Sequence, residues 1–401
     1  MCGIFAYTGA KKAEPILLEG LSLLEYRGYD SAGIFMPGNT LTKTPGAVAE
    51  LKAKMKLGSD AKSGIAHLRW ATHGEPTEVN AHPHTDCEGD IYVAHNGIIE
   101  NFRELKAGLV ERGHTFKSET DTEVLAHLIE EGITAGKSFE DSVVETLEKV
   151  RGTYGLLISY AKEPDTVITA RMGSPIVLGV GQGENFIASD AAPILKHTKE
   201  VIFLNDGDIA IITPTSYRVR TLRDAHIDRP TETIEWDAEQ ATRGGYLHFM
   251  LKEIFEAPEV LRNAVRGRLI AKEGNVKLGG LENVKEKLKD IDRLIIVACG
   301  TAYYAGLVGE YMIEELAEVP VEVELASEFR YRKPVVGEKT AVLAISQSGE
   351  TLDTLEAMRE GKRRGALTLG IVNTVGSTIA RESKAGIYNH AGPEIGVAST
   401  K

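Results

Sequence analysis

The sequence has few cysteines and no long apolar run. Its three cysteines, Cys2, Cys87 and Cys299, are odd in number and widely separated, which argues against a disulfide framework and favours a reducing compartment. No stretch approaches the ~20 apolar residues of a membrane span. Polar residues at 11–15 interrupt the N-terminal segment where a signal peptide would carry its apolar core. These absences predict a cytoplasmic protein that does not enter the membrane.

Positive charge is in deficit. The chain has 46 Lys and Arg against 58 Asp and Glu, a formal net charge of −12. This balance argues against nucleic acid or an anionic membrane as a general partner, although a local basic pocket could still bind phosphate. A length of 401 residues exceeds the size at which one hydrophobic core keeps growing. We therefore expect two or more domains.

The first half combines short apolar or alternating runs with a few amphipathic segments. Runs bounded by Gly, Asp or Pro predict strands at 2–9, 64–70, 89–95, 152–160, 165–173, 175–181 and 184–190. Residues 201–214 predict a hairpin whose turn is Asn205-Asp206-Gly207-Asp208. Helices are expected at 15–28, 120–132 and 138–152, the second opened by a capping box of Thr120 and Glu123. Sheets covered by helices predict a layered α+β domain.

The second half has a different pattern. Residues 226–247 are polar and end in glycine, so we expect a linker between a first domain at 1–225 and a second at 248–401. A helix is expected at 248–265, and from about residue 291 strands and helices alternate. This alternation predicts an α/β domain with a doubly wound parallel sheet, whose ligands bind at the carboxyl ends of the strands.

Cys2 follows the initiator methionine directly. Cells remove the first methionine when the next residue is small, and Cys2 would then carry both a thiol and a free α-amine. These two groups could form a self-contained nucleophile and base. Chain ends are usually frayed and without function, so the rest of the sequence has to decide between the two interpretations.

Polar clusters at the ends of predicted elements offer the other groups that such a nucleophile needs. Attack on an amide requires donors for the oxyanion, a cation for the substrate carboxylate and an anion for its ammonium. Asn96 and Gly97 could supply the donors, Arg69 a bidentate cation and Asp121 the anion. Singly, each has an ordinary explanation as a turn, a surface charge or a favourable helix-start residue. Only the set is informative.

Several stretches resemble one enzyme family. They are MCGIFAYTG, EYRGYDSAG, GIAHLRWATHG, NAHPH, VAHNGIIEN and SETDTE, followed by GSPIVLGVG, ENFIASD, ASEFRYRK, SQSGET and EIGVASTK. In this order, over essentially the whole chain, they resemble the glutamine–fructose-6-phosphate aminotransferases, also called glucosamine-6-phosphate synthases. MCGI and an Asn-Gly pair alone would suggest only the wider class of N-terminal-nucleophile amidotransferases.

The resemblance implies a four-layer α/β/β/α glutaminase domain at 1–225 and a sugar-isomerase domain that begins at 248. In the glutaminase domain, it implies Cys2 as nucleophile, with its own α-amine as base, and Asn96 and Gly97 as the oxyanion hole. Glutamine binding is implied for Arg69 at the carboxylate and Asp121 at the ammonium. Thr72 and His73 would line the pocket, and Trp70 and Arg27 would close it and let ammonia pass inward.

The segment Ser346 to Thr351, SQSGET, lies between a predicted strand and a predicted helix. Hydroxyls and backbone N–H groups at a helix start can bind an anion without lysine, although Ser/Gly turns that merely cap a helix are common. The resemblance implies a sugar-phosphate site formed by Cys299, Gly300, Thr301, Ser346, Gln347, Ser348, Thr351, Glu394, Val397 and Ser399. The family commonly has serine where this chain has Ala302, so we expect slightly weaker phosphate binding.

A further cluster, His82, His84, Asp86 and Cys87, could hold a metal ion. Its spacing fits no standard zinc pattern, and a predicted strand follows it immediately. We therefore expect no metal site, and the chemistry above requires no cofactor.

The sequence predicts an enzyme of amino-sugar biosynthesis that converts fructose 6-phosphate and glutamine to glucosamine 6-phosphate and glutamate. The family implies a homodimer formed through the isomerase domains. Because the chain stops inside EIGVASTK, we expect a fragment that hydrolyses glutamine but makes no amino sugar. The alternatives are a sugar-phosphate-binding regulator with a vestigial glutaminase fold, and a different amidotransferase such as one that deglycates amino acids. The complete MCGI, RWATHG and HNGIIEN set counts against both.

Overall fold

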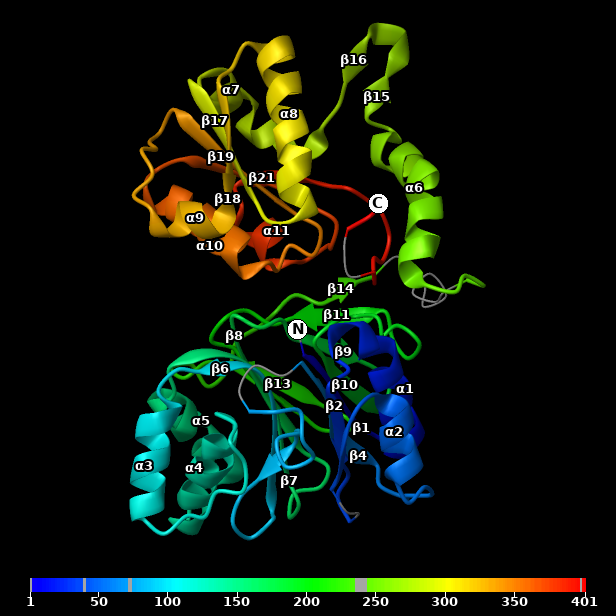
Figure 1. Ribbon diagram of the computed structural model, residues 1–401, viewed down its shortest axis with the longest axis vertical. Coiled ribbons are helices and arrows are strands. Elements are labelled where there is room, and N and C mark those ends of the chain that lie inside the picture. The colour runs from blue at the N-terminus through cyan, green and yellow to red at the C-terminus, as the bar shows by residue number, and fades with distance from the viewer. Residues whose placement is uncertain (1, 39–40, 71–73, 235–243, 397–398) are drawn as a thin grey trace. The chain divides into compact units, whose positions relative to one another are not determined.

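The computed structural model describes residues 2–38, 41–70, 74–234, 244–396 and 399–401 (Figure 1). The chain divides into two units, Met1–Ala238 and Glu239–Lys401. The segment expected as a linker contributes a short strand, β14 (Glu232–Thr233), which pairs with β11 (Glu200–Phe203) in the first unit. Part of that segment, 235–243, lies outside the described residues.

The first unit contains two antiparallel sheets. The first has the strand order β14-β11-β9-β10-β1-β4-β2-β3, and the second has the order β13-β12-β8-β7-β6-β5. Besides β14 and β11, the first sheet contains β1 (Gly3–Gly9), β2 (Ser31–Phe35), β3 (Thr42–Pro45), β4 (Ser63–Arg69), β9 (Val177–Val180) and β10 (Glu184–Ala188). The second contains β5 (His84–Thr85), β6 (Ile91–Ile99), β7 (Gly152–Tyr160), β8 (Val167–Met172), β12 (Ile209–Ile212) and β13 (Tyr217–Arg220).

Helices cover the outer face of each sheet. The first sheet is covered by α1 (Ala13–Leu24), which a short 3₁₀ turn, η1 (Glu25–Arg27), extends, and by α2 (Val48–Lys54). The second is covered by α3 (Phe102–Glu111), α4 (Glu123–Thr134) and α5 (Phe139–Lys149). Figure 1 shows these two groups of helices on opposite sides of the unit.

Apolar side chains from both sheets meet between them. Ile4 and Ile65 of the first sheet belong to the same buried cluster as Ala94 and Leu157 of the second. Burial of alternate residues on strands with helices outside produces the four-layer α/β/β/α architecture. The predicted fold class is therefore confirmed for this unit.

The hairpin expected at 201–214 is wrong. β11 pairs with β9 in the first sheet, whereas β12 pairs with β8 in the second. The polar turn between them serves ion pairs instead. Asp206 lies 3.3 Å from the buried Arg171, and both oxygens of Asp208 accept hydrogen bonds of 2.7 Å from Arg229. Residues Asn205 to Asp208 therefore connect strands of two different sheets and place ion-paired carboxylates there, instead of forming the turn of a β-hairpin.

The capping box expected at Thr120 and Glu123 does not form either. α4 begins at Glu123, and the Thr120 hydroxyl lies 3.0 Å from His84 Nε2. The Glu123 carboxylate instead accepts the N–H groups of Lys117 at 2.7 Å and Ser118 at 2.6 Å. Both side chains therefore hold the loop before the helix rather than the helix end itself.

The second unit is built around a parallel sheet with the order β18-β17-β19-β20-β21. Its strands are β17 (Arg293–Ala298), β18 (Val321–Leu325), β19 (Thr340–Ser346), β20 (Leu367–Val372) and β21 (Ala385–Tyr388). The helices are α6 (Phe249–Val265), α7 (Lys285–Lys289), α8 (Thr301–Ala317), α9 (Ala326–Tyr331), α10 (Leu352–Arg363) and α11 (Thr378–Glu382). A small ribbon of β15 (Leu269–Ile270) and β16 (Asn275–Val276), with the 3₁₀ turns η3 (Ala271–Glu273) and η4 (Gly279–Val284), precedes the sheet.

Apolar residues cover this sheet on both faces. One buried cluster joins Val297 and Val342 to Phe329 of α9 and Leu355 of α10. The other joins the alternate strand residues Leu294 and Ile296 to Val284 of η4, with Ile313 of α8 packed against it. The unit is therefore doubly wound, as predicted, and its strand order reverses between β17 and β19.

Candidate functional site

Cys2 lies at the start of β1, beside the end of β4. Its Sγ atom accepts the N–H of Trp70 at 3.2 Å. Its carbonyl oxygen accepts two side-chain donors, Asn96 Nδ2 at 3.1 Å and Arg27 Nε at 3.2 Å. Trp70 after β4, Asn96 of β6 and Arg27 of the 3₁₀ turn after α1 therefore all contact Cys2.

A small cavity opens beside the Cys2 thiol. It is lined by Cys2, Arg69, Trp70, His82, His95, Gly97, Thr120, Asp121 and Thr122. Five of the residues predicted for the glutaminase site share this cavity, and two more, Asn96 and Arg27, contact the Cys2 carbonyl. The structure thus brings together every predicted glutamine-site residue except Thr72 and His73, which lie outside the described residues.

Gly97 lies next to Asn96 on β6 in a conformation that only glycine adopts readily. Its φ is +137°, and a Cβ atom there would lie 2.1 Å from the Thr153 carbonyl oxygen. The neighbouring strand therefore approaches the backbone closely at this point. The Asn-Gly pair is not a hairpin turn: it lies within β6, which pairs with β7 through both residues, and Asn96 Nδ2 donates to the Cys2 carbonyl.

Arg69 and Asp121 are held by backbone groups. The Arg69 guanidinium donates to the carbonyls of Glu75 and Gly74, each at 3.1 Å. Asp121 Oδ2 accepts the N–H of Ile99 at 2.6 Å. Both side chains are almost fully buried and line the cavity with opposite charges. Such a pair suits an amino acid, which carries both a carboxylate and an ammonium.

Gly28, in the EYRGY stretch, is required by close packing. A Cβ atom at this position would lie 2.9 Å from the carbonyl carbon of Arg69. The preceding residue, Arg27, is buried and lies 3.8 Å from Asp190, which also accepts the Tyr26 hydroxyl at 2.8 Å. Burial acts to lower the pKa of Arg27, but Tyr26 and Asp190 hold it above its usual value. Arg27 therefore stays charged beside Cys2.

The surroundings of the Cys2 thiol both raise and lower its pKa. Burial raises the pKa of the Cys2 thiol, whereas the Trp70 N–H and the positive charges of Arg69 and Arg27 lower it. A thiolate at this position thus depends on nearby donors and cations rather than on solvent.

Four buried histidines, His67, His82, His84 and His95, lie in or near the cavity; His82 and His95 line it, and the sequence suggested no role in glutamine binding for any of the four. His67 and His82 stack with their ring centroids 4.3 Å apart, and His82 packs edge-on against His84 at 4.6 Å. Burial lowers the pKa of His67 to about 3 and lowers the pKa values of His82, His84 and His95 as well. They are therefore neutral hydrogen-bonding groups. The available signal was histidine inside otherwise apolar strand patterns.

The set His82, His84, Asp86 and Cys87 does not gather around one point. His82 and His84 belong to the histidine group above, and His82 Nδ1 accepts the N–H of His95 at 3.1 Å. Asp86 Oδ1 closes a turn by accepting the N–H groups of Gly89, Asp90 and Ile91. The metal arrangement considered from the sequence spacing is therefore not formed.

In the second unit, the predicted sugar-phosphate residues follow two neighbouring parallel strands. β17 and β19 pair in register up to Ala298 and Ile345, and each is followed by a loop and a helix start. Gly300, with φ +59°, precedes α8, and Thr351 precedes α10. Cys299 to Thr301 and Ser346 to Thr351 thus meet at the point where the strand order reverses, the usual ligand position in doubly wound sheets.

The SQSGET loop is shaped by its own hydroxyls. Ser346 Oγ accepts the N–H of Gly349 at 3.1 Å and lies 3.1 Å from the Thr351 hydroxyl. The carbonyl of Gln347 accepts the N–H of Asn373 at 3.0 Å, and Ser348 Oγ accepts the N–H of Glu350 at 3.2 Å. Ala302, in the first turn of α8, offers no hydroxyl to this site.

Glu394 and Ser399 lie on the segment that follows β21, and Val397 is outside the described residues. Glu394 Oε1 accepts the N–H of Thr400 at 2.6 Å, and burial raises the pKa of Glu394. Glu253 of α6 accepts the N–H groups of Ile395 at 2.6 Å and Gly396 at 2.9 Å. This segment is therefore anchored to α6.

Comparisons with known proteins agree on both units. A glutamine amidotransferase domain model matches residues 67–196, and a SIS domain model matches residues 287–401. A glutamine–fructose-6-phosphate aminotransferase [isomerizing] from Chlorobaculum tepidum is 50% identical over 409 residues, which cover 100% of this chain and 67% of that protein. The chain belongs to this aminotransferase family. The predicted family is therefore confirmed.

Other members of the aminotransferase family match at similar levels. An enzyme of the same name from Thermus thermophilus is 49% identical over 411 residues, covering 100% of this chain and 66% of that protein. The chain thus spans about two thirds of the length of these relatives. Within the described ranges, every helix is too short or too polar to cross a lipid bilayer.

A solved structure shares the fold. Glutamine phosphoribosylpyrophosphate amidotransferase from B. subtilis matches 92% of this aminotransferase-family chain and 81% of its own chain, with a TM-score of 0.50 and 19% sequence identity. At that identity, the match bears on the fold alone.

Proposed function

We propose that the first unit hydrolyses glutamine with Cys2 as the nucleophile, and that the whole protein uses the ammonia to convert fructose 6-phosphate to glucosamine 6-phosphate. The observation that carries this proposal is the position of Cys2. Its thiol accepts the Trp70 N–H at 3.2 Å beside a cavity that also holds Arg69 and Asp121. Relatives named for the same reaction are about half identical over the whole chain.

The reaction begins once Met1 has been removed. The free α-amine of Cys2 takes the thiol proton, since the ordinary pKa values of the two groups, ~7.7–8.0 and ~8.5, are close. The thiolate adds to the glutamine amide carbon, and the oxyanion accepts hydrogen bonds from Asn96 Nδ2 and the Gly97 N–H. As the adduct collapses, the Cys2 α-ammonium returns its proton to the leaving nitrogen, ammonia departs, and the thioester left on Cys2 is hydrolysed by water to glutamate. Loss of one such oxyanion donor costs about 10²–10³ in kcat.

The second unit takes the sugar. Hydroxyls and backbone N–H groups of the SQSGET loop, with Cys299 to Thr301 beside it, bind the phosphate of fructose 6-phosphate at the starts of α10 and α8. Arg69 and Asp121 select glutamine in the first unit by its carboxylate and ammonium. Assembly as a homodimer through the isomerase domains and a cytoplasmic location complete the proposal.

Glutamate release from glutamine tests the nucleophile. The wild-type chain, with loss of Met1 verified by intact mass, is expected to release glutamate, and Cys2→Ala is expected to abolish release. A chain with one lysine inserted before Cys2 keeps the thiol but moves the α-amine away, and we expect it to be inactive as well. An active lysine-extended chain would contradict the role of the amine. Activity of Cys2→Ala would contradict the proposal as a whole.

Adding fructose 6-phosphate distinguishes the proposed enzyme from the remaining alternative, a sugar-phosphate-binding regulator. A regulator with a vestigial glutaminase fold would bind the sugar phosphate but release no glutamate from the trimmed chain, with or without sugar. The proposed enzyme releases glutamate in at least the sugar-bound state.

A further inference from the structure

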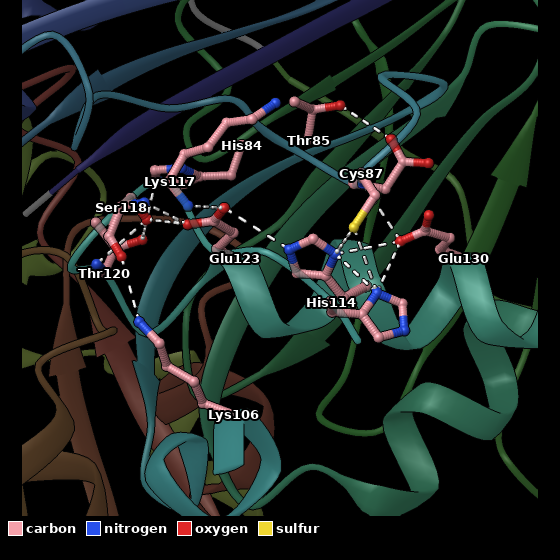
Figure 2. A network of polar contacts seen from close by, with 12 residues as sticks. His84, Thr85, Cys87, Lys106, His114, Lys117, Ser118, Thr120, Glu123 and Glu130 are labelled. Atoms are coloured by element: carbon pink, nitrogen blue, oxygen red, sulfur yellow. Dashed lines mark hydrogen bonds and ion pairs between the residues drawn. The ribbon is translucent and has the colours of Figure 1, made fainter. Parts of the chain in front are cut away.

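Four potential metal ligands converge at a site that the glutaminase chemistry does not use. Cys87 lies in the loop between β5 and β6, His114 lies in the segment between α3 and α4, and His127 and Glu130 lie one turn apart on α4. One ligand atom from each lies within 4.8 Å of the others. Figure 2 shows the side chains of Cys87, His114 and Glu130 directed toward one another.

Five of the six separations between these atoms match those of a tetrahedral zinc site, and the sixth, from Cys87 Sγ to Glu130, is at most 4.8 Å. Bond lengths of ~2.3 Å to sulfur and ~2.0–2.1 Å to nitrogen or oxygen give tetrahedron edges of about 3.3 Å between nitrogens and about 3.6 Å between sulfur and nitrogen. The two Nδ1 atoms of His114 and His127 are 3.3 Å apart, and Cys87 Sγ lies 3.6 Å from each. Glu130 Oε2 lies 3.1 Å from His114 Nδ1 and 3.2 Å from His127 Nδ1.

The outer nitrogen of each histidine faces a carboxylate. His114 Nε2 lies 3.3 Å from Glu131, and His127 Nε2 lies 3.7 Å from Glu123. Zinc binding through both Nδ1 atoms requires each neutral ring to carry its proton on Nε2, the side on which Glu131 and Glu123 lie. Both Nδ1 lone pairs then point at the same place as the Cys87 sulfur and a Glu130 oxygen. A cation at this point takes the place of the protons that otherwise bridge Glu130 Oε2 and the Nδ1 atoms.

We propose that Cys87, His114, His127 and Glu130 bind one Zn²⁺ ion in a structural site. A thiolate and two imidazoles favour zinc over magnesium or calcium, which prefer oxygen ligands. Four protein ligands leave no open position for substrate, so the ion stabilises structure. Binding displaces the proton of the Cys87 thiol to solvent. The carboxylates of Glu123 and Glu131 act as the outer partners that orient the two rings.

The site ties the Cys87 loop and the His114 segment to α4, close to the glutamine pocket. Glu123 links the His127 ring to the N–H groups of Lys117 and Ser118, which precede Asp121 in the chain. Thr120 of the same loop reaches His84, and both Thr120 and Asp121 line the Cys2 cavity. Zinc at this position therefore steadies the loop that presents Asp121.

Metal content tests this proposal. Because an N-terminal cysteine can itself bind metal through its thiol and amine, the measurements use the Cys2→Ala protein. After chelator treatment and titration with Zn²⁺, we expect about one tightly bound ion per chain. With Co²⁺ as the probe, we expect a thiolate-to-cobalt charge-transfer band and the intense visible bands of a tetrahedral site. Circular dichroism verifies that each protein is folded.

Variants assign the ligands. Cys87→Ser is expected to remove the charge-transfer band, and His127→Ala to remove stoichiometric binding. Glu131→Gln keeps all four ligands and is expected to weaken zinc binding by about 10- to 100-fold. Cys299→Ser and His226→Ala, a cysteine and an exposed histidine elsewhere, are expected to retain the ion. A folded Cys2→Ala protein that binds neither ion stoichiometrically, or one whose cobalt spectrum survives Cys87→Ser, would overturn the proposal.

Discussion

The Nε2 atom of His67 lies 3.1 Å from Asn96 Oδ1 and 3.1 Å from the carbonyl oxygen of His95. Both partners are acceptors, so Nε2 carries the proton of this neutral ring. The bond fixes the orientation of the Asn96 amide and turns its Nδ2 donor toward Cys2. His67 thus acts on the proposed oxyanion hole through Asn96.

Replacing His67 tests this positioning role. We expect His67→Ala to lower kcat for glutamate release by about 10-fold or more, less than the ~10²–10³ for loss of an oxyanion donor, with little change in KM. His67→Gln, which can still donate an N–H, should recover part of the loss. Because His67 stays neutral down to about pH 3, the pH profile of the remaining activity should be unchanged. A His67→Ala enzyme with wild-type kcat would contradict this role.

Gly97 provides a second test, through the backbone. Gly97→Ala meets both an unfavourable φ of +137° and the Thr153 carbonyl at 2.1 Å, so we expect destabilisation above the ~1–3 kcal/mol of backbone strain alone, and loss of glutamate release. Gly113 is the matched control. Its φ is +98°, but a Cβ atom there meets nothing within 4 Å. Urea unfolding should therefore show a smaller loss for Gly113→Ala, and activity should persist. Equal losses would rule out crowding as the cause.

The buried histidines predict how stability depends on pH. Burial depresses the pKa of His67 to about 3 and lowers those of His82 and His95. In the unfolded chain these rings take up protons near pH ~6.5, whereas in the folded protein they do not. The stability that these neutral rings give the folded protein is therefore complete above pH ~6.5. It is lost as the pH falls toward the pKa values that the rings have in the folded protein. Each such ring lowers the free energy of unfolding by about 1.4 kcal/mol for every pH unit of decrease in this range.

Urea unfolding at several pH values between ~6.5 and ~5 measures this slope, before carboxylates titrate. Replacement of His82 by Asn should reduce the slope of the free energy of unfolding against pH by the equivalent of about one proton. Replacement of the exposed His226 should leave it unchanged. A wild-type free energy of unfolding that is flat over this range would show that the rings take up protons in the folded state.

Periodicity predicted most of the elements that bury a regular face among the described residues. β6 and β7 are buried over consecutive residues in their middles, and β17 and β19 are continuous apolar runs between glycine or polar loops. The family stretches also named Cys2, Asn96 and Arg69, and in the structure Cys2 and Arg69 line one cavity while Asn96 donates to the Cys2 carbonyl.

Long-range pairing was beyond the local pattern. Asn205 to Asp208 has the composition of a hairpin turn, yet β11 and β12 enter different sheets because Asp206 and Asp208 pair with Arg171 and Arg229. The four ligands of the proposed zinc site also come from three separate segments, so no spacing in the sequence marks them. Of the buried histidines, His67 and His95 were marked only by their presence in apolar strands, and His82 and His84 suggested a metal cluster that does not form.

The charged turn at Asp208 yields a stability prediction. The Asp208 side chain is fully buried, and it accepts two hydrogen bonds from Arg229 and one of 2.7 Å from the N–H of Asn205. Asp208→Ala leaves these donors without an acceptor, and we expect a loss of about 3 kcal/mol in the free energy of unfolding. Asp228→Asn, at a solvent-exposed carboxylate, is the control and should cause no measurable change. A neutral Asp208→Ala variant would show that water replaces the carboxylate.

The sugar-phosphate loop can be tested at Gly349. This residue has a φ of +64°, and a Cβ atom there would lie 2.0 Å from Ser377 Oγ, in the turn before α11. The Gly349 N–H also donates to Ser346 Oγ, so displacing the backbone opens the hydroxyl and N–H cradle that we assign to phosphate.

Gly349→Ala is therefore expected to weaken fructose 6-phosphate binding, measured by calorimetry, by about 10-fold or more. Loss of one charge-assisted hydrogen bond of ~1.5–3 kcal/mol implies a change of this size. Gly337→Ala, at a position where a Cβ atom meets nothing within 4 Å, should bind like wild type. Glutamate release should survive in Gly349→Ala when it is assayed without sugar, because Cys2 and its partners lie in the other unit. Unchanged sugar binding in Gly349→Ala would place the phosphate elsewhere than on this loop.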